Sequence, residues 1–337
     1  MIIKNNTIDV IYTHTEGEPT CIIYGGINYP ANTTIYEKKE FLEKDSRQIR
    51  QSLLREPRGH NDMVGVFLTP PSSKEFDAGM LWADGERFME MCGHGTIALS
   101  MVMVTHGMIN KITKPFTQIK FETLAGSVTS SVKYEDNIAK YTEFTNVPAF
   151  VYKKNIPINL PIYGELKADI VWGGNFFAVV KWPDKNKRIK PENSTLLSEM
   201  GNLVKEQINK KLKIVHPKNK KINGLYYTTF WHEPDRPDSK YKNVHVFANG
   251  KLDRSPGGTG TSSMLAYFED RGEIKKGGKL KSEGLISSGQ FEGEILDIYN
   301  DGGIKYIIPK VRGTASILGY AKWILNEDDE VSKGFVI

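Results

Sequence analysis

Two glycine-rich segments, one in each half of the chain, lead directly into apolar runs. Residues 91–104 read MCGHGTIALSMVMV, and residues 256–268 read PGGTGTSSMLAYF. When the segments are aligned, Cys92 lies over Gly257, at an offset of 257 − 92 = 165 residues in a chain of 337. A helix that is apolar on most faces must be buried by other elements. The repeat therefore predicts two similar halves, each organised around one buried helix.

Most of the remaining pattern indicates short strands. Runs of β-branched and aromatic residues are typical of strands, and here they outnumber the helical patterns. We expect strands at Ile8–Tyr12, Cys21–Tyr24, Val64–Leu68, Gln118–Glu122, Phe177–Val180, Leu225–Phe230, Val244–Ala248 and Lys305–Ile308. We expect helices at residues 38–55, 95–107, 194–212 and 260–271. Each half then has strands that can wrap its apolar helix, so the expected fold class is α/β.

Composition and patterning exclude several broad classes. The net charge of +5 and the 25% of charged residues are ordinary for a soluble protein. The basic stretch 205–221 has helical apolar spacing, so a solvated helix face explains it better than a nucleic-acid site. No apolar run is long enough to span a membrane, and residues 1–7 lack the apolar core of a signal peptide. We therefore expect a cytoplasmic protein, and no spacing of His and Cys residues predicts a metal site.

The two cysteines have different sequence settings. Cys21 lies in a β-type run and is predicted to be a core residue, and so few cysteines suit a reducing compartment. Cys92 directly precedes an apolar helical run, where unpaired N–H groups and the helix dipole favour a thiolate and can also bind a carboxylate. The alternative for Cys92 is a small buried residue at a strand-to-helix turn. His94 has either a functional role, orienting the substrate or supporting the thiolate, or a structural role at the helix start.

Several segments carry a resemblance to a known family. They are residues 14–19 (HTEGEP), 56–63 (EPRGHNDM), 91–96 (MCGHGT), 146–150 (NVPAF), 173–177 (GGNFF) and 253–261 (DRSPGGTGT). Together, and in this order, they resemble the proline racemase family, which comprises proline racemases, hydroxyproline 2-epimerases and trans-3-hydroxy-L-proline dehydratases. The resemblance implies an enzyme that acts on a small cyclic amino acid, uses no cofactor and no metal, and forms a homodimer.

The resemblance also implies a fold and a division into domains. The fold is diaminopimelate-epimerase-like: two similar α/β domains each place a curved sheet around a central helix, with the active site in the cleft between them. We expect a first domain at residues 1–133, to which residues from about 317 to 337 return, and a second domain at 134–316. The segment 134–137 (YEDN) is expected to form the turn near the crossover.

The family motifs assign roles to particular positions. Cys92 is the expected base that removes the Cα proton, and Asp253 matches an aspartate that accepts a hydrogen bond from the ring nitrogen of the substrate. Phe247 matches a pocket phenylalanine, whereas Val64 and Met89 stand where similar proline racemases carry Phe and Leu. The smaller side chain at 64 would leave room beside a hydroxylated ring, and core variation is the alternative. The backbone N–H groups expected to bind the substrate carboxylate belong to Gly93, His94, Gly258 and Thr259.

One position departs from the patterns of the family. Racemases and epimerases carry a second cysteine where this chain has Gly257, and the dehydratases typically carry threonine. Inversion by two bases requires a proton acceptor on one ring face and a donor on the other, and glycine can be neither. Dehydration of trans-3-hydroxy-L-proline requires one base only, because its 3-hydroxyl and Cα hydrogen share a ring face. There Cys92 could take the proton and return it to the departing hydroxyl. We therefore expect a lyase that forms Δ1-pyrroline-2-carboxylate.

Two alternatives to the lyase stay open. One is an isomerase, a proline racemase or hydroxyproline 2-epimerase, in which water in the space left by Gly257 serves as the second acid. The other is a catalytically silent amino-acid-binding relative, against which the intact Cys92 counts. The products distinguish them, because a lyase forms an imine, an isomerase forms the inverted amino acid and a binding protein forms neither.

Overall fold

The computed structural model describes residues 7–44, 47–286, 289–326 and 328–337. They form two units: unit 1 comprises Met1–Phe144 and Thr314–Ile337, and unit 2 comprises Thr145–Gly313. The expectation about a signal peptide concerns a segment that lies almost wholly outside the described residues. Among the helices of the described residues, none is long and apolar enough to cross a membrane.

The boundary between the units lies at residues 144 and 145, later than the expected 133 and 134. The expected boundary falls inside the strand β7 (Gly126–Glu135), which pairs with β6 (Phe116–Thr123) as far as the partners Lys133 and Phe116. The predicted turn does form at Asp136 and Asn137, which have φ values of 51° and 60°. It connects β7 to β8 and lies within unit 1.

Unit 1 is built on a mixed sheet. Antiparallel pairs join β18 to β1, β1 to β2, β3 to β4 and β6 to β7, while β2–β3 and β4–β6 are parallel and the short β5 pairs with β4. Its helices are α1 (Ile35–Lys44), α2 (Arg47–Leu54), α3 (Gly93–Thr105) and the 3₁₀ turn η3 (Val331–Lys333). Its strands are β1 (Thr7–Thr15), β2 (Glu18–Gly25), β3 (Val64–Thr69), β4 (Ala78–Ala83), β5 (Phe88–Met89), β6, β7, β8 (Ile138–Thr145) and β18 (Ser316–Ile324).

Unit 2 repeats this arrangement. Antiparallel pairs join β9 to β10, β10 to β11, β12 to β13, β15 to β16 and β16 to β17, while β11–β12 and β13–β15 are parallel and the short β14 pairs with β13. Its helices are η2 (Pro191–Asn193), α4 (Ser194–Lys211) and α5 (Gly258–Asp270). Its strands are β9 (Phe150–Leu160), β10 (Gly164–Trp172), β11 (Phe176–Lys181), β12 (Tyr227–His232), β13 (Tyr241–Phe247), β14 (Lys251–Asp253), β15 (Lys279–Glu283), β16 (Gln290–Asp301) and β17 (Ile304–Gly313).

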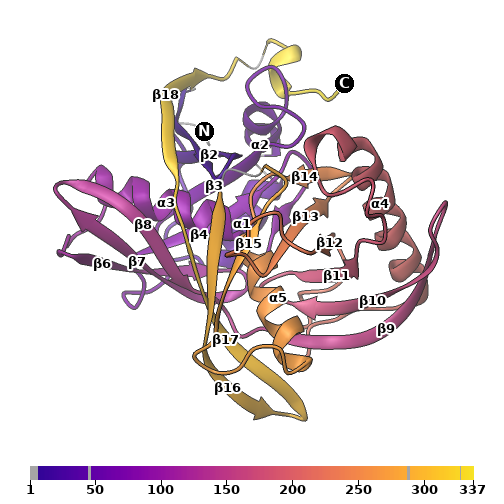
Figure 1. Ribbon diagram of the computed structural model, residues 1–337. Helices are drawn as coiled ribbons and strands as arrows, with labels where there is room; N and C mark the ends of the chain where they lie inside the picture. Colours follow the sequence, from indigo (N-terminus) through magenta and orange to yellow (C-terminus); the bar gives the residue numbers. More distant parts are fainter. Residues whose placement is uncertain (1–6, 45–46, 287–288, 327) are drawn as a thin grey trace. The chain divides into compact units, whose positions relative to one another are not determined.

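The repeat in the sequence corresponds to equivalent helices in the two units. α3 and α5 have 13 residues each. A hairpin with a short second strand precedes each helix, β4–β5 before α3 and β13–β14 before α5. The strand after each helix pairs in parallel with the first strand of its hairpin, β6 with β4 and β15 with β13. α3 packs against β1, β2, β3 and β7, and α5 packs against β9, β10, β16 and β17 (Figure 1). Each unit therefore wraps its strands around a buried helix, as the apolar runs predict.

The expected elements are largely confirmed. All eight expected strands overlap observed ones, and the helices expected at 95–107, 194–212 and 260–271 correspond to α3, α4 and α5. The pattern at 38–55 corresponds to two helices, α1 and α2, with residues 45 and 46 outside the described ranges. The sequence reading missed several strands, among them β4, which is buried at every position and therefore lacks the alternation of a half-exposed strand.

Candidate active site

Cys92 is the N-cap residue of α3. Its backbone is extended, with φ −140° and ψ 115°, and its Sγ accepts a hydrogen bond from the Gly95 N–H at 3.4 Å. The Thr96 hydroxyl donates to the Cys92 carbonyl at 2.7 Å and fixes the first turn. The thiol thus has the position that a serine or aspartate side chain has in ordinary N-caps, where backbone donors favour a negative charge. The prediction that Cys92 stands at a helix N-terminus is confirmed.

Gly95 lets the start of α3 lie close to the sheet. A Cβ atom there would be 2.9 Å from both Val66 Cγ2 and Trp82 Cδ1, closer than such contacts allow. Val66 lies two residues after Val64 on β3, so both side chains point to the same face of the sheet. Met89 pairs with Trp82 across β5 and β4. The structure therefore places both expected pocket residues of unit 1, Val64 and Met89, on strands next to the start of α3.

The His94 side chain lies beside the thiol. Both of its ring nitrogens are 3.5 Å from Cys92 Sγ, so the sulfur is equally near two polar atoms of the ring. The backbone carbonyl of His94 accepts a hydrogen bond from the Thr15 hydroxyl at 3.0 Å, which ties β1 to the first turn of α3. The backbone of His94 is thus anchored in the fold and its imidazole contacts the sulfur, while its functional role stays a prediction.

In unit 2, the start of α5 is connected to Asp253 by hydrogen bonds. Asp253 ends β14, and its Oδ1 accepts from the Ser255 N–H at 2.8 Å and from the Ser255 hydroxyl at 2.7 Å. Ser255 Oγ in turn accepts from the Gly257 N–H at 3.1 Å. Gly257 is the N-cap of α5, with φ 74° and ψ 116°, and Gly258 and Thr259 open the helix. Four of the five expected residues of this unit, Asp253, Gly257, Gly258 and Thr259, thus lie within one hydrogen-bonded segment, and the fifth, Phe247, lies on β13.

His245 lies next to these residues and was missed in the sequence analysis. It pairs with Asp253 across β13 and β14, and a Cβ atom on Gly257 would be only 2.2 Å from its Nε2. Its Nδ1 is 2.8 Å from the Thr229 hydroxyl, and its Nε2 is 3.1 Å from the Pro256 carbonyl. The pKa of His245 is lowered by burial, which outweighs the Asp253 carboxylate and the Pro256 carbonyl that raise it. The space beside Gly257 is therefore filled by an imidazole, which leaves no room there for the water of the isomerase alternative.

One sequence signal could have pointed to His245. It lies two residues before Phe247 on β13, and residues two apart on a strand share a face. Phe247 was already assigned to the pocket, and its ring lies 6.1 Å from that of Tyr227 in a stacked arrangement. The alternation of β13 thus places a titratable side chain on the face already assigned to the substrate pocket.

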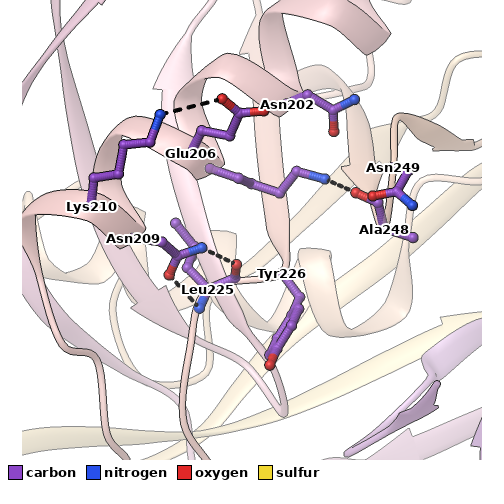
Figure 2. Close-up of a pocket in the computed structure, with 9 residues that line it drawn as sticks. Asn202, Glu206, Asn209, Lys210, Leu225, Tyr226, Ala248 and Asn249 are labelled. Carbon is purple, nitrogen blue, oxygen red and sulfur yellow. Dashed lines mark hydrogen bonds and ion pairs between the residues drawn. The ribbon is translucent and has the colours of Figure 1, made fainter. Parts of the chain in front are cut away.

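A separate pocket in unit 2 contains none of the expected site residues. It lies between α4 and the ends of β12 and β13, and its polar groups bond to one another (Figure 2). Asn209 donates to the Leu225 carbonyl at 2.8 Å and accepts from its N–H at 3.1 Å, and Lys205 Nζ donates to the Ala248 carbonyl. These bonds hold α4 against the sheet, so we assign this pocket a structural role. In the part of the chain that the structure describes, no cluster of His, Cys, Asp and Glu residues is arranged to hold a metal ion.

Comparison with known proteins gives the family. The model of the proline racemase family matches residues 10–336. A 4-hydroxyproline 2-epimerase from Cereibacter sphaeroides is 51% identical over 329 residues, which are 98% of each chain. A trans-3-hydroxy-L-proline dehydratase from Bacillus thuringiensis subsp. konkukian is 34% identical over 331 residues, 98% of this chain and 97% of the relative. The crystal structure of a hydroxyproline epimerase from Agrobacterium vitis with bound trans-4-hydroxy-L-proline has a TM-score of 0.91 at 28% identity, covering 100% of this chain and 96% of that one.

The fold and the capping thiol define an α/β protein made of two equivalent units, each with a sheet-wrapped helix, one of which begins at a cysteine. With the matches above, the chain belongs to the proline racemase family. The resemblance found in the sequence and the diaminopimelate-epimerase-like fold class are both confirmed. The chain is thus a member of an enzyme family whose named relatives act on proline or hydroxyproline.

Proposed function

We propose that the protein is a 4-hydroxyproline 2-epimerase, which interconverts trans-4-hydroxy-L-proline and cis-4-hydroxy-D-proline. The observation that carries this proposal is the 51% identity, over nearly the whole of both chains, to a relative with that name. The dehydratase expected from the sequence has weaker support, since the relative with that name is 34% identical. The isomerase alternative thus takes precedence over the lyase.

In the proposed reaction, Cys92 is the base that acts on the L epimer. Its thiolate removes the proton from C2, the electron pair of the C–H bond stays on the substrate, and the charge spreads into the carboxylate. The N–H group of Gly95 supports the thiolate before the transfer. Negative charge on the substrate carboxylate grows as the bond breaks, so donors already in place stabilise the transition state most. We assign this task to the backbone N–H groups of Gly93, His94, Gly258 and Thr259.

Asp253 is proposed to hold the ring nitrogen of the substrate. The Ser255 N–H and hydroxyl fix one of its carboxylate oxygens, which orients the side chain. A carboxylate beside the nitrogen favours its ammonium form, and that positive charge makes the C2 proton easier to remove. Phe247, Val64 and Met89 are proposed to surround the ring, with the short side chain of Val64 leaving room for a hydroxyl group.

The dehydratase remains a second candidate because residue 257 bears no side chain that could act as an acid. The two functions are separated by incubating the purified protein with trans-4-hydroxy-L-proline, L-proline and trans-3-hydroxy-L-proline. We expect chiral chromatography to detect cis-4-hydroxy-D-proline as the fastest product. Formation of imine from trans-3-hydroxy-L-proline without any inversion would instead identify a lyase. Binding of the amino acids with neither product would identify the silent relative.

The role of Cys92 is tested with a matched control at the other cysteine. We expect Cys92→Ala to lower turnover by about 10³-fold or more, since a positioned acid–base group contributes roughly 10²–10⁴-fold and no other base takes its place. Cys21 is the other buried cysteine of unit 1 and lies on β2, so Cys21→Ala should retain activity. Equal activity in both variants would contradict the proposed role.

A further inference from the structure

Two glycines at the start of α5 leave space that the His245 imidazole occupies. A Cβ atom on Gly257 would lie 2.2 Å from Nε2 and 2.3 Å from Cδ2 of His245. A Cβ atom on Gly260, one turn further along the helix, would lie 2.0 Å from Cε1 and 2.1 Å from Nε2. No side chain at either position can coexist with the imidazole in this place. The imidazole thus occupies the place at which a side chain on residue 257 would begin.

The imidazole is held in this place from several elements. Thr229 on β12 contacts Nδ1, the Pro256 carbonyl before α5 contacts Nε2, and the Phe177 ring on β11 lies edge-on at 5.5 Å. A carbonyl can only accept, so Nε2 carries a proton in this arrangement. In the imidazolium, Nδ1 donates to the Thr229 hydroxyl and Nε2 donates to the Pro256 carbonyl. A ring that has given up its Nε2 proton keeps the bond at Nδ1 and loses the one to the Pro256 carbonyl.

One charged group in the described structure acts on this ring electrostatically. It is Asp253, the cross-strand neighbour of His245, whose carboxylate favours the imidazolium but does not outweigh burial, which keeps the pKa of His245 below its ordinary value. The same carboxylate is proposed above to bind the ring nitrogen of the substrate. His245 thus adjoins two positions of the proposed site, the N-cap of α5 at Gly257 and the carboxylate at 253.

We propose that His245 is the second acid–base group of the epimerase and replaces the cysteine that the family carries at position 257. This inference rests on the proposed function and deepens it. Gly257 has no side chain that could accept or donate a proton, and in this proposal His245 on the neighbouring strand β13 supplies that group. The proposal also explains why Gly257 and Gly260 are both glycine.

The proton transfers balance without any further reactant. In the L-to-D direction, the Cys92 thiolate takes the C2 proton on one ring face, and the His245 imidazolium gives its Nε2 proton to C2 on the other face. Cys92 is then a thiol and His245 is neutral. This is the form that acts on the D epimer, with neutral Nε2 as base and the thiol as acid. The two forms of the enzyme carry the same number of protons, and exchange with solvent restores the first.

The test compares inversion with hydrogen exchange in His245→Gln. In D₂O, we expect the formation of the D epimer to fall at least 100-fold, because the proton donor on the second face is lost. Exchange of deuterium into the recovered L epimer needs only Cys92 and should fall less than tenfold. A merely structural histidine would lower both processes together. Inversion within threefold of the unaltered enzyme, or an equal loss of exchange and inversion, would overturn the inference.

Rescue by a cysteine gives an independent test if His245→Gln folds poorly. Gly257→Cys alone should lose inversion, since the new side chain collides with the imidazole. In the combined variant His245→Ala with Gly257→Cys, the space is free, and we expect inversion at least tenfold faster than in His245→Ala. Absence of that rescue in a variant with an intact thermal unfolding transition would contradict the inference. If the unaltered enzyme shows no inversion at all, the proposed function itself fails, which is distinguishable from failure of the role of His245.

Discussion

At the scale of single residues, two separate physical features favour glycine at position 257. Its φ of 74° lies in the left-handed region, which side chains with a Cβ rarely adopt. The imidazole of His245 also fills the space of a side chain. The first feature concerns the backbone alone, and the second connects the glycine to the chemistry proposed for His245.

The two features can be separated with alanine. Gly257→Ala should destabilise the protein by about 2–4 kcal/mol, because backbone strain of about 1 kcal/mol adds to the cost of displacing a packed ring. Gly272 has a similar φ of 71°, and no atom lies within 4 Å of its ideal Cβ position. Gly272→Ala should therefore show the backbone cost alone. Urea unfolding measures both, and equal effects of the two substitutions would contradict the steric account.

At the scale of elements, α3 and α5 begin in the same way but have different side chains at their N-termini, Cys92 at α3 and His245 beside α5. Both helices begin after a short hairpin and have a glycine three residues after the N-cap position, Gly95 in α3 and Gly260 in α5. Gly95 approaches apolar side chains of the sheet, whereas Gly260 approaches His245. In the proposed mechanism, the N-cap of α3 carries its acid–base group itself, and the N-cap of α5 has its acid–base group next to it on β13.

Gly95→Ala tests whether the position of the first turn of α3 affects the reactivity of Cys92. The added Cβ would press on Trp82 and Val66 and shift the first turn, so we expect a loss of 10-fold or more in C2 hydrogen exchange, together with lower stability. Gly107 follows the same helix, and its ideal Cβ has no neighbour within 4 Å. Gly107→Ala is the control and should retain the exchange rate. A Gly95→Ala variant with unchanged exchange would show that the position of the first turn is unimportant.

His216 gives unit 2 a predictable dependence on pH. Its ring lies 4.6 Å from that of Trp172, and its Nδ1 accepts from the N–H groups of Lys218 and Asn219 at 3.2 Å each. Burial, followed by the charge of Lys218, lowers the pKa of His216 to about 4. The unfolded chain, with a histidine pKa of about 6.5, then binds more protons than the folded protein. Stability is therefore lost as the pH falls from about 6.5 towards 4.

The contribution of this histidine is measured by comparing unfolding free energies at pH 7 and pH 5. His216→Asn keeps an acceptor for the two backbone N–H groups but cannot titrate. Between pH 7 and pH 5, we expect the unfolding free energy of the variant to fall by about 1 kcal/mol less than that of the unaltered protein, allowing for the partial exposure of the ring. The variant is expected to be less stable at pH 7, so the difference between the two pH values is the relevant quantity. The same pH dependence in both proteins would contradict this account.

At the scale of the whole molecule, local patterns predicted each central helix, whereas the return of the chain to unit 1 was expected from the family resemblance, at about residue 317, and begins at Thr314. The runs after Cys92 and Gly257 are local, and they predicted α3 and α5 to within two residues at each end. The relation between Gly257 and His245 depends on strands brought together by folding, so neither residue indicated it alone. The isomerase alternative placed a water beside Gly257 where the structure has the imidazole of His245, because a glycine in a sequence does not show what fills its space.

Unit 1 depends on the last residues of the chain. β18 pairs with β1 along its length, from Thr7 with Ile324 to His14 with Ser316. Arg58 donates to the Ile324 and Ser332 carbonyls at 2.9 Å each. Deleting residues 314–337 should therefore increase amide hydrogen exchange throughout β1 and β2 of unit 1. Strands β10–β13 of unit 2 should keep their protection, because their pairing lies within that unit, and equal loss in both units would contradict the division.

The family resemblance also predicts a homodimer. Analytical ultracentrifugation of the purified full chain should give the mass of two chains, twice 38.0 kDa. A single species with the mass of one chain at micromolar concentration would contradict this prediction. The proposed acid–base groups of both units belong to one chain, so the account of the chemistry does not depend on the result.

The most direct test of the central claim is proton NMR of trans-4-hydroxy-L-proline incubated with the enzyme in D₂O. The account predicts that the C2 proton signal disappears, and that cis-4-hydroxy-D-proline accumulates with deuterium at C2 until the two epimers reach equilibrium. Cys92→Ala should leave the spectrum unchanged over the same time. Persistence of the C2 signal with the unaltered enzyme, or its loss without any D epimer, would contradict the account.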